Sequence, residues 1–146
     1  MFYDKDLNSI SIVSSEKTEP SIVDLMEGFL KENNKTGYLT FQVTQDSPLF
    51  GRLPVKDAKI TVSKELGSNY FISRILVSDS DGKTEKIPLP TVSADLSLSP
   101  GNGRTYATYN VSVEAPNFTT EEIYDIPIFE GIISIQPVNL EADIKV

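Results

Sequence analysis

Carboxylates gather in one stretch of the sequence, where Glu121, Glu122, Asp125 and Glu130 fall within ten residues. Two carboxyl groups that flank a glycosidic bond are the usual machinery of glycoside hydrolysis. The acid of such a pair needs a raised pKa, which burial supplies, whereas these residues follow the polar run "TTEE". We therefore interpret them as a solvated acidic turn and predict no catalytic residue among them.

The segment "DSDGKTE", which begins at Asp79, contains the acidic and glycine residues of a calcium loop. An EF-hand needs a carboxylate at position one, glycine at position six and glutamate at position twelve. With Gly82 at position six, Val77 occupies position one; with Asp79 at position one, Lys83 and Pro90 occupy positions five and twelve. Both registers fail, so the segment predicts a plain hairpin turn.

Two further motifs match signatures of penicillin-binding enzymes. "SSEK" (residues 14–17) fits S-x-x-K and "KTG" (residues 35–37) fits the lysine motif. They lie close together with no S-D-N between them, and the chain is too short for that enzyme fold. We interpret the matches as accidental.

The composition removes several kinds of chemistry. The 146 residues include no cysteine and no histidine, which excludes disulfides, thiolate catalysis, cysteine-ligated metals and a Ser-His-Asp triad. The formal net charge of -8 argues against nucleic-acid binding, and no segment has the length of a membrane span. We expect a non-enzyme with no cofactor and no metal.

Aromatic side chains are concentrated near the end of the chain and could line a ligand groove. The alternative is that Tyr109 and Phe129 belong to the core while the others cover loop ends, because large aromatics dominate burial in small sandwiches. We favour this alternative. The residues concerned are Tyr106, Tyr109, Phe118, Tyr124 and Phe129.

The elements that would position these residues begin with one helix. Residues 21–33, "SIVDLMEGFLKEN", have apolar side chains at helical spacing, with Ser21 as N-cap and Asp24 in the first turn. A helix of this length is marginal alone, so it must pack on the following domain, on another copy or on a partner. The predicted partner-binding residues are Ile22, Leu25, Met26, Phe29 and Leu30.

From residue 37 the apolar period changes to two, which indicates strands. Seven short strands with turn signals between them, and no intervening helices, predict an all-β fold: a seven-stranded antiparallel β-sandwich with one N-terminal amphipathic helix. Residues 45–57 and 91–105 are expected to be loops, and Ile10–Val13 an edge strand or an unstructured arm. Ile133 and Ile135 share a face that Val138 and Leu140 need not share, because Pro137 shifts the phase.

Over residues 37–140 the order of motifs resembles the transthyretin-like, carboxypeptidase-regulatory-like domain family. The matching segments are "GYLTFQV", "LPVKDAKITVS", "VSDSDGKTEKIPLP" and "YATYNVSVEAPNF". In this resemblance Ala58 takes a small buried position, Asp81-Gly82 the turn, and Val111, Val113 and Phe118 the last strand and its end. Asn117 replaces the usual glycine, and asparagine also tolerates a positive φ.

The closing "YATYNVSVEAPNF" with "IPIFEGIISIQPVNL" is similar to a variant found in clostridial spore cortex-lytic enzymes. The resemblance implies a non-catalytic pro-region or accessory module that inhibits, folds or positions a peptidoglycan-lytic catalytic domain, with that domain or a second copy as partner. It implies a spore or extracytoplasmic location, although the chain shows no signal peptide. The alternative is a free-standing adhesin that binds carbohydrate or protein through loops 45–57 and 91–105. The expected organisation is an arm and helix (1–36), a sandwich (37–140) and a tail (141–146).

Overall fold

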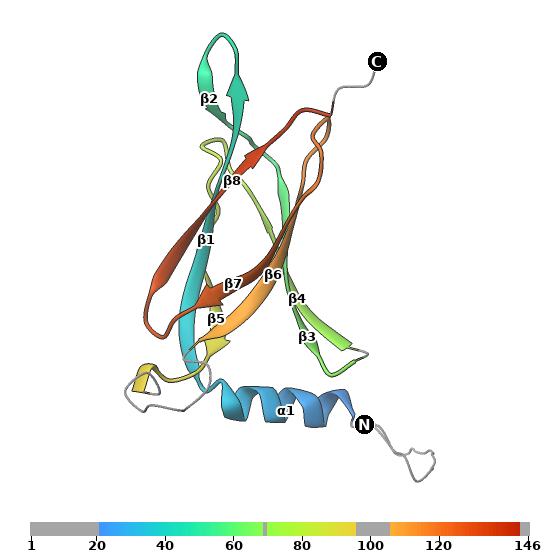
Figure 1. Cartoon of the computed structure of the whole chain (residues 1–146), viewed down its shortest axis with the longest axis vertical. Helices are drawn as coiled ribbons and strands as arrows, with labels where there is room; N and C mark the ends of the chain where they lie inside the picture. The colour runs from blue at the N-terminus through green and yellow to red at the C-terminus, as the bar shows by residue number, and fades with distance from the viewer. Residues whose placement is uncertain (1–20, 69, 96–105, 144–146) are drawn as a thin grey trace.

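The computed structural model describes residues 21–68, 70–95 and 106–143, and these form two β-sheets with one helix across an end of the sandwich (Figure 1). The structure thereby confirms a mostly-β sandwich, but with eight strands where seven were expected. The elements are α1 (Ile22–Glu32), β1 (Lys35–Ser47), β2 (Gly51–Pro54), β3 (Lys59–Leu66), β4 (Tyr70–Val77), β5 (Ile87–Thr91), β6 (Ala107–Glu114), β7 (Glu121–Ile128) and β8 (Ile133–Leu140).

The first sheet, sheet A, is built around the long strand β1. One edge of β1 pairs antiparallel with β5 over its first half and with β2 over its last residues. The other edge pairs with β8 over eight consecutive positions, from Tyr38 opposite Ile133 to Gln45 opposite Leu140. This last pairing is parallel, so the expectation of a wholly antiparallel sandwich is wrong at this strand.

The second sheet, sheet B, has the antiparallel order β4-β3-β6-β7. The inward side chains of both sheets form a single core, as period-two alternation requires. Its largest fully buried members include Phe41, Tyr109, Leu39, Ile60 and Ile128. Ala58, the small position of the predicted pattern, is fully buried, and Asn117 has a φ of 71°, as expected for a residue that replaces glycine.

Helix α1 forms as the sequence predicts. The hydroxyl of Ser21 accepts a hydrogen bond from the backbone N–H of Asp24 at 3.1 Å, which caps the first turn. At the other end Asn33 donates from both its backbone and its side chain to the carbonyl of Phe29. The helix covers one end of the sandwich, opposite the protruding β1–β2 hairpin (Figure 1).

Three local expectations are wrong. Residues 45–57 are not a loop, because β1 continues to Ser47 and turns into β2; Pro48, Gly51 and Pro54 had concealed this hairpin. The acidic run Glu121–Glu122 lies on strand β7 and not in a turn. The turn at Gly82 is not a hairpin, since the flanking strands β4 and β5 lie in different sheets.

The arm and tail predictions lie partly outside the described residues. Ile10–Val13, the "SSEK" motif and residues 96–105 of the expected second loop all fall there. The described part of the tail pairs with the chain that follows β6: Ala142 forms a bridge with Phe118, and the N–H of Asp143 donates to the carbonyl of Asn117.

Two buried hydroxyls join segments that the backbone ladders do not join. Thr91 on β5 is fully buried; its Oγ1 donates to the carbonyl of Ile128 at 2.6 Å and accepts from the N–H of Ala107 at 2.9 Å. Ser78 likewise donates to the carbonyl of Val55 and accepts from the N–H of Ala58. Buried polar groups need partners, and those of Thr91 lie on β6 and β7. The Thr91 hydroxyl therefore links sheet A to sheet B.

The buried phenol of Tyr109 makes the free energy of unfolding depend on pH in the alkaline range. Burial raises the pKa of its phenol above the ordinary value of 10.0, and its hydroxyl donates to the carbonyl of Pro90 at 2.6 Å. Above pH 10.0 the phenol therefore loses its proton in the unfolded chain before it does so in the folded chain. The free energy of unfolding must then fall as pH rises.

We expect Tyr109→Phe to lower the free energy of unfolding by about 1 kcal/mol at neutral pH, because one hydrogen bond is lost. Above about pH 10 the difference should shrink, since the variant lacks the titrating phenol. Urea unfolding of both proteins between pH 7 and pH 11.5 measures this. Curves that stay parallel across the whole range would contradict the assignment.

Candidate binding surfaces

The five helix residues predicted to bind a partner are divided between the core and the surface. Phe29 is buried in the core, and Leu25 and Met26 pack against it. Ile22 and Leu30 remain exposed at 38% and 45%. The apolar face of α1 is thus largely occupied by its own sandwich, and partner binding by these five residues stays a prediction.

The aromatic residues do not line one groove. Tyr109 lies in the core, as favoured above, and Phe118 is half-buried. Phe129, expected in the core, is 39% exposed and packs against Tyr106 in a tilted arrangement, with 5.3 Å between ring centroids. Tyr124 points to solvent and donates to the carboxylate of Glu122, which raises the pKa of the phenol.

The acidic residues of the predicted turn are divided between strand β7 and the turn that follows it. Glu121, Glu122 and Asp125 are exposed on β7, and Glu130 accepts a hydrogen bond from the N–H of Ala94 at 2.8 Å. Among the described residues no group of three or more acidic side chains could hold a metal ion.

The turn that starts at Asp79 is held by its own carboxylate. Oδ1 of Asp79 accepts from the N–H groups of Lys83 and Asp81, and these bonds lower the pKa of the carboxyl. Gly82 has a φ of 75°, and its carbonyl accepts from the N–H of Val43 at 2.7 Å. Oδ1 of Asp79 therefore builds the turn.

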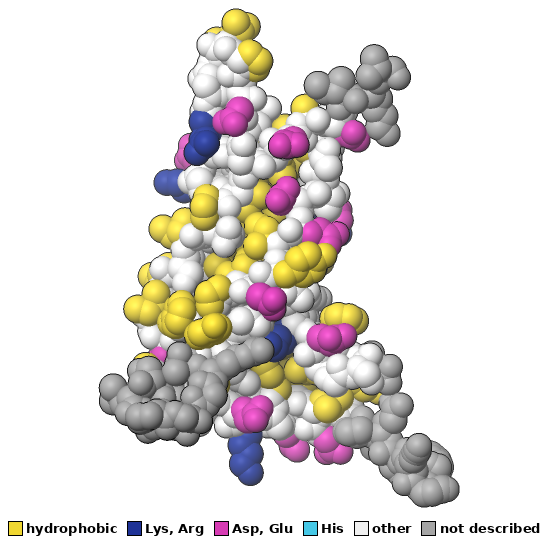
Figure 2. Space-filling view, viewed as in Figure 1, with side chains coloured by type: hydrophobic (Ala, Val, Ile, Leu, Met, Phe, Trp, Pro, Cys, Tyr) yellow, Lys and Arg dark blue, Asp and Glu magenta, His cyan; other side chains and the backbone are white. Residues whose placement is uncertain are grey.

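The clearest surface feature is an apolar row across the outer face of sheet A. Ile133 is opposite Tyr38, which is opposite Pro88, so three strands contribute one row. Ile135 lies one row along, opposite Thr40. Figure 2 shows hydrophobic side chains gathered over this side of the molecule. We call Tyr38, Pro88, Ile133 and Ile135 the sheet A patch.

The sheet A patch is accessible. Ile133 and Ile135 are 50% and 67% exposed, and Ile132 in the preceding turn is 52% exposed. The Nζ of Lys86 lies 5.0 Å from the centroid of the Tyr38 ring, a cation–π contact that leaves a charge at the border. Clustered apolar side chains with a polar border mark interaction surfaces more often than scattered ones do.

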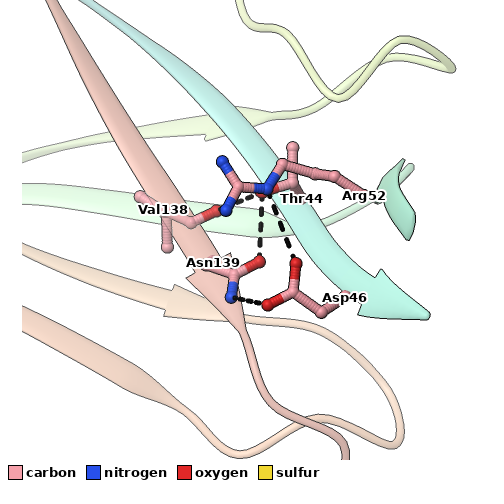
Figure 3. A network of polar contacts seen from close by, with 5 residues as sticks. All are labelled: Thr44, Asp46, Arg52, Val138 and Asn139. Carbon is pink, nitrogen blue, oxygen red and sulfur yellow. Dashed lines mark hydrogen bonds and ion pairs between the residues drawn. The ribbon is translucent and has the colours of Figure 1, made fainter. Parts of the chain in front are cut away.

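A second apolar feature is the tip of the β1–β2 hairpin, where Leu49 and Phe50 are 85% and 74% exposed. Its base is tied to β8 (Figure 3): Asn139 accepts from the hydroxyl of Thr44 at 3.2 Å and donates to Asp46 at 3.1 Å. The ion pair between Arg52 and Asp46 is solvent-exposed and contributes little stability.

Comparisons with known proteins identify no family. No family model matches the chain, and no curated protein matches it. A solved type II cohesin–X-dockerin complex from Acetivibrio cellulolyticus, an N-terminal interface mutant, aligns at 16% identity and a TM-score of 0.40, covering 73% of this chain and 58% of that chain. A 9R-lipoxygenase from Cyanothece PCC8801 aligns at 12% identity and a TM-score of 0.27, covering 79% and 19%. This chain therefore spans less than two thirds of either, and neither likeness assigns a function.

The sequence contained one signal for the sheet A patch. Ile133 and Ile135 were expected to share a face that Val138 and Leu140 need not share; in the structure the first pair is exposed and the second is buried. The cause is parity and not Pro137, because the pairing of β8 with β1 runs without a shift. As for membranes, α1 has 11 residues, and no helix among the described residues has the length and hydropathy to cross a bilayer.

Proposed function

We propose that this chain is a non-catalytic β-sandwich module that binds a protein partner through the sheet A patch. The observation that carries the proposal is the pair of outward isoleucines, Ile133 and Ile135, beside the half-buried Tyr38. Covering a fully exposed side chain of this kind yields about 1.5–3 kcal/mol, so the two isoleucines would supply part of the free energy of binding, and the rest of the interface must offset the entropy lost on association.

The family resemblance supplies the finer part of the proposal. The partner is a peptidoglycan-lytic catalytic domain, and the module acts as a pro-region or accessory domain of a spore cortex-lytic enzyme, in inhibition, folding or positioning. A second copy of the chain is the other partner considered. Support comes from the order of motifs over residues 37–140 and from the carboxylates, which are solvated or engaged in turns.

The protruding hairpin favours one alternative function. Leu49 and Phe50 stand at the tip, within one of the two loops that the adhesin hypothesis assigned to ligand binding. A free-standing adhesin would use this tip to bind carbohydrate or protein at a cell surface.

A pair of double variants separates the two functions. We expect Ile133→Asp/Ile135→Asp to weaken binding to the catalytic domain of a cortex-lytic enzyme by at least about 100-fold, because two apolar contacts are replaced by charges. The matched control Leu49→Ser/Phe50→Ser, altered at the tip alone, should bind like wild type. Isothermal titration calorimetry gives the affinities, and light scattering reports association between copies.

Two results would count against the proposal. Unchanged affinity in the isoleucine variant would show that the sheet A patch is not the interface. Retention of the wild-type chain on purified cortex peptidoglycan, lost in the tip variant and kept in the isoleucine variant, would establish the adhesin function in its place.

A further inference from the structure

Strand β4 is an edge strand whose composition is that of an interior strand. Among the described strands, β2, β4, β5, β7 and β8 each pair with one neighbour only. Four of these five contain proline, which blocks further pairing at a free edge; β4, "YFISRILV", contains none. The doubly paired strands β1, β3 and β6 also contain none. The prolines are Pro54, Pro88, Pro90, Pro127 and Pro137.

The edge of β4 that no described strand pairs with presents backbone N–H and C=O groups to a further strand. The N–H of Ser78 donates to the carbonyl of Ala58, in continuation of the β3–β4 register, so even-numbered residues of β4 face β3. The odd-numbered residues therefore direct their N–H and C=O groups away from the sheet. Their side chains are largely apolar and exposed: Phe71 at 66%, Ile75 at 59% and Val77 at 58%.

An apolar cavity opens beside this edge, between the two sheets. Its volume is about 140 Å³, and its lining is largely apolar. β4 contributes Ile72, Ser73 and Arg74 to the lining, and β5 contributes Leu89 and Pro90. Because side chains of a strand alternate between faces, every second side chain of a strand added to β4 would be directed into this gap.

Arg74 supplies the charge that selects the strand. It lies on the cavity side of β4, opposite Val62, and it is exposed. Within the described parts of the chain its guanidinium has no ion-pair or hydrogen-bond partner. A carboxylate on the added strand, two residues from the side chain that enters the cavity, would meet it.

We propose that β4 accepts an extended segment of a partner protein as an added strand, with one apolar side chain in the cavity and an acidic side chain paired with Arg74. Backbone hydrogen bonds would supply affinity and the alternate side chains specificity, as in other cases of strand addition. A second copy of the chain fits less well, because pairing centred on Arg74 would oppose two like charges and each copy carries a net charge of -8. This site is on sheet B and does not depend on the function proposed for the sheet A patch.

The test uses a displayed library of random 12-residue peptides against the full chain. We expect enriched peptides to alternate apolar and polar residues and to contain Asp or Glu. Ser73→Pro removes one outward N–H and should lower the affinity for an enriched synthetic peptide about tenfold. The matched Ser73→Ala keeps that N–H and should change this affinity less than about twofold. Arg74→Glu should also weaken binding about tenfold.

A second measurement leaves the protein unaltered. Two peptides are made, one methylated at the backbone nitrogens of its odd residues and one at those of its even residues. The peptide whose methylated nitrogens face β4 should not bind, whereas the other should bind like the parent peptide. The proposal is overturned if no peptide is enriched, if Ser73→Pro and both methylated peptides bind as tightly as their parents, or if light scattering shows a dimer that Ser73→Pro dissociates.

Discussion

Gly82→Ala is expected to lower the free energy of unfolding by about 2–5 kcal/mol. Two causes act together. Gly82 has a φ of 75°, a left-handed conformation that costs other residues energy, and a Cβ built on it would lie 2.3 Å from the carbonyl oxygen of Val43. That oxygen belongs to the middle of β1, so neither partner can move without disturbing the sheet.

Gly131→Ala is the matched control for this prediction. Gly131 has nearly the same φ, 74°, but nothing lies within 4 Å of its Cβ position. It should therefore show the conformational cost alone, about 1–2 kcal/mol. Urea unfolding monitored by circular dichroism gives both values. Equal losses in the two variants would mean that the contact between Gly82 and Val43 has no energetic effect.

Thr91→Val is expected to cost about 2–4 kcal/mol although the two side chains have nearly the same shape. The methyl that replaces the hydroxyl leaves the carbonyl of Ile128 and the N–H of Ala107 without their partner in a buried site. An unpaired buried polar group costs about 1–3 kcal/mol, more than the hydrogen bond itself contributes.

Thr91→Ser separates the hydroxyl from the methyl. Serine keeps both hydrogen bonds and removes one methyl group, so its loss should be about 1 kcal/mol. Chemical denaturation with an unchanged m-value would show that the native state alone is affected. If the valine variant were as stable as the serine variant, the hydrogen bonds of the Thr91 hydroxyl would not stabilise the contact between the sheets.

The sequence predicted the elements whose signals are local. Ser21 and the apolar spacing after it located α1 to within a residue at each end. The change to period-two alternation from residue 37 predicted strands, and the structure places all its described strands from Lys35 onward. β2 was missed because its hairpin is rich in proline and glycine, and the beginning of β7 because the outward carboxylates of an edge strand resemble a polar turn.

Features that depend on pairing could not be predicted from local patterns. Nothing in residues 133–140 indicates that β8 lies parallel to β1, because register is decided by segments more than 90 residues apart. The same holds for the two buried hydroxyls: serine and threonine are usually exposed, and only the fold shows that Thr91 and Ser78 have backbone partners. The sheet A patch was predicted in part. The sequence placed Ile133 and Ile135 on one face, but only the structure shows that this face is exposed.

The parallel pairing of β1 with β8 also determines how the molecule resists tension. The first strand and the last lie side by side in the same direction, so a pull on the two ends of the described chain loads their ladder lengthwise. All eight positions must then rupture together, whereas an antiparallel hairpin pulled from its open end unzips one position at a time. The β1–β8 ladder would therefore resist such a pull as a single unit.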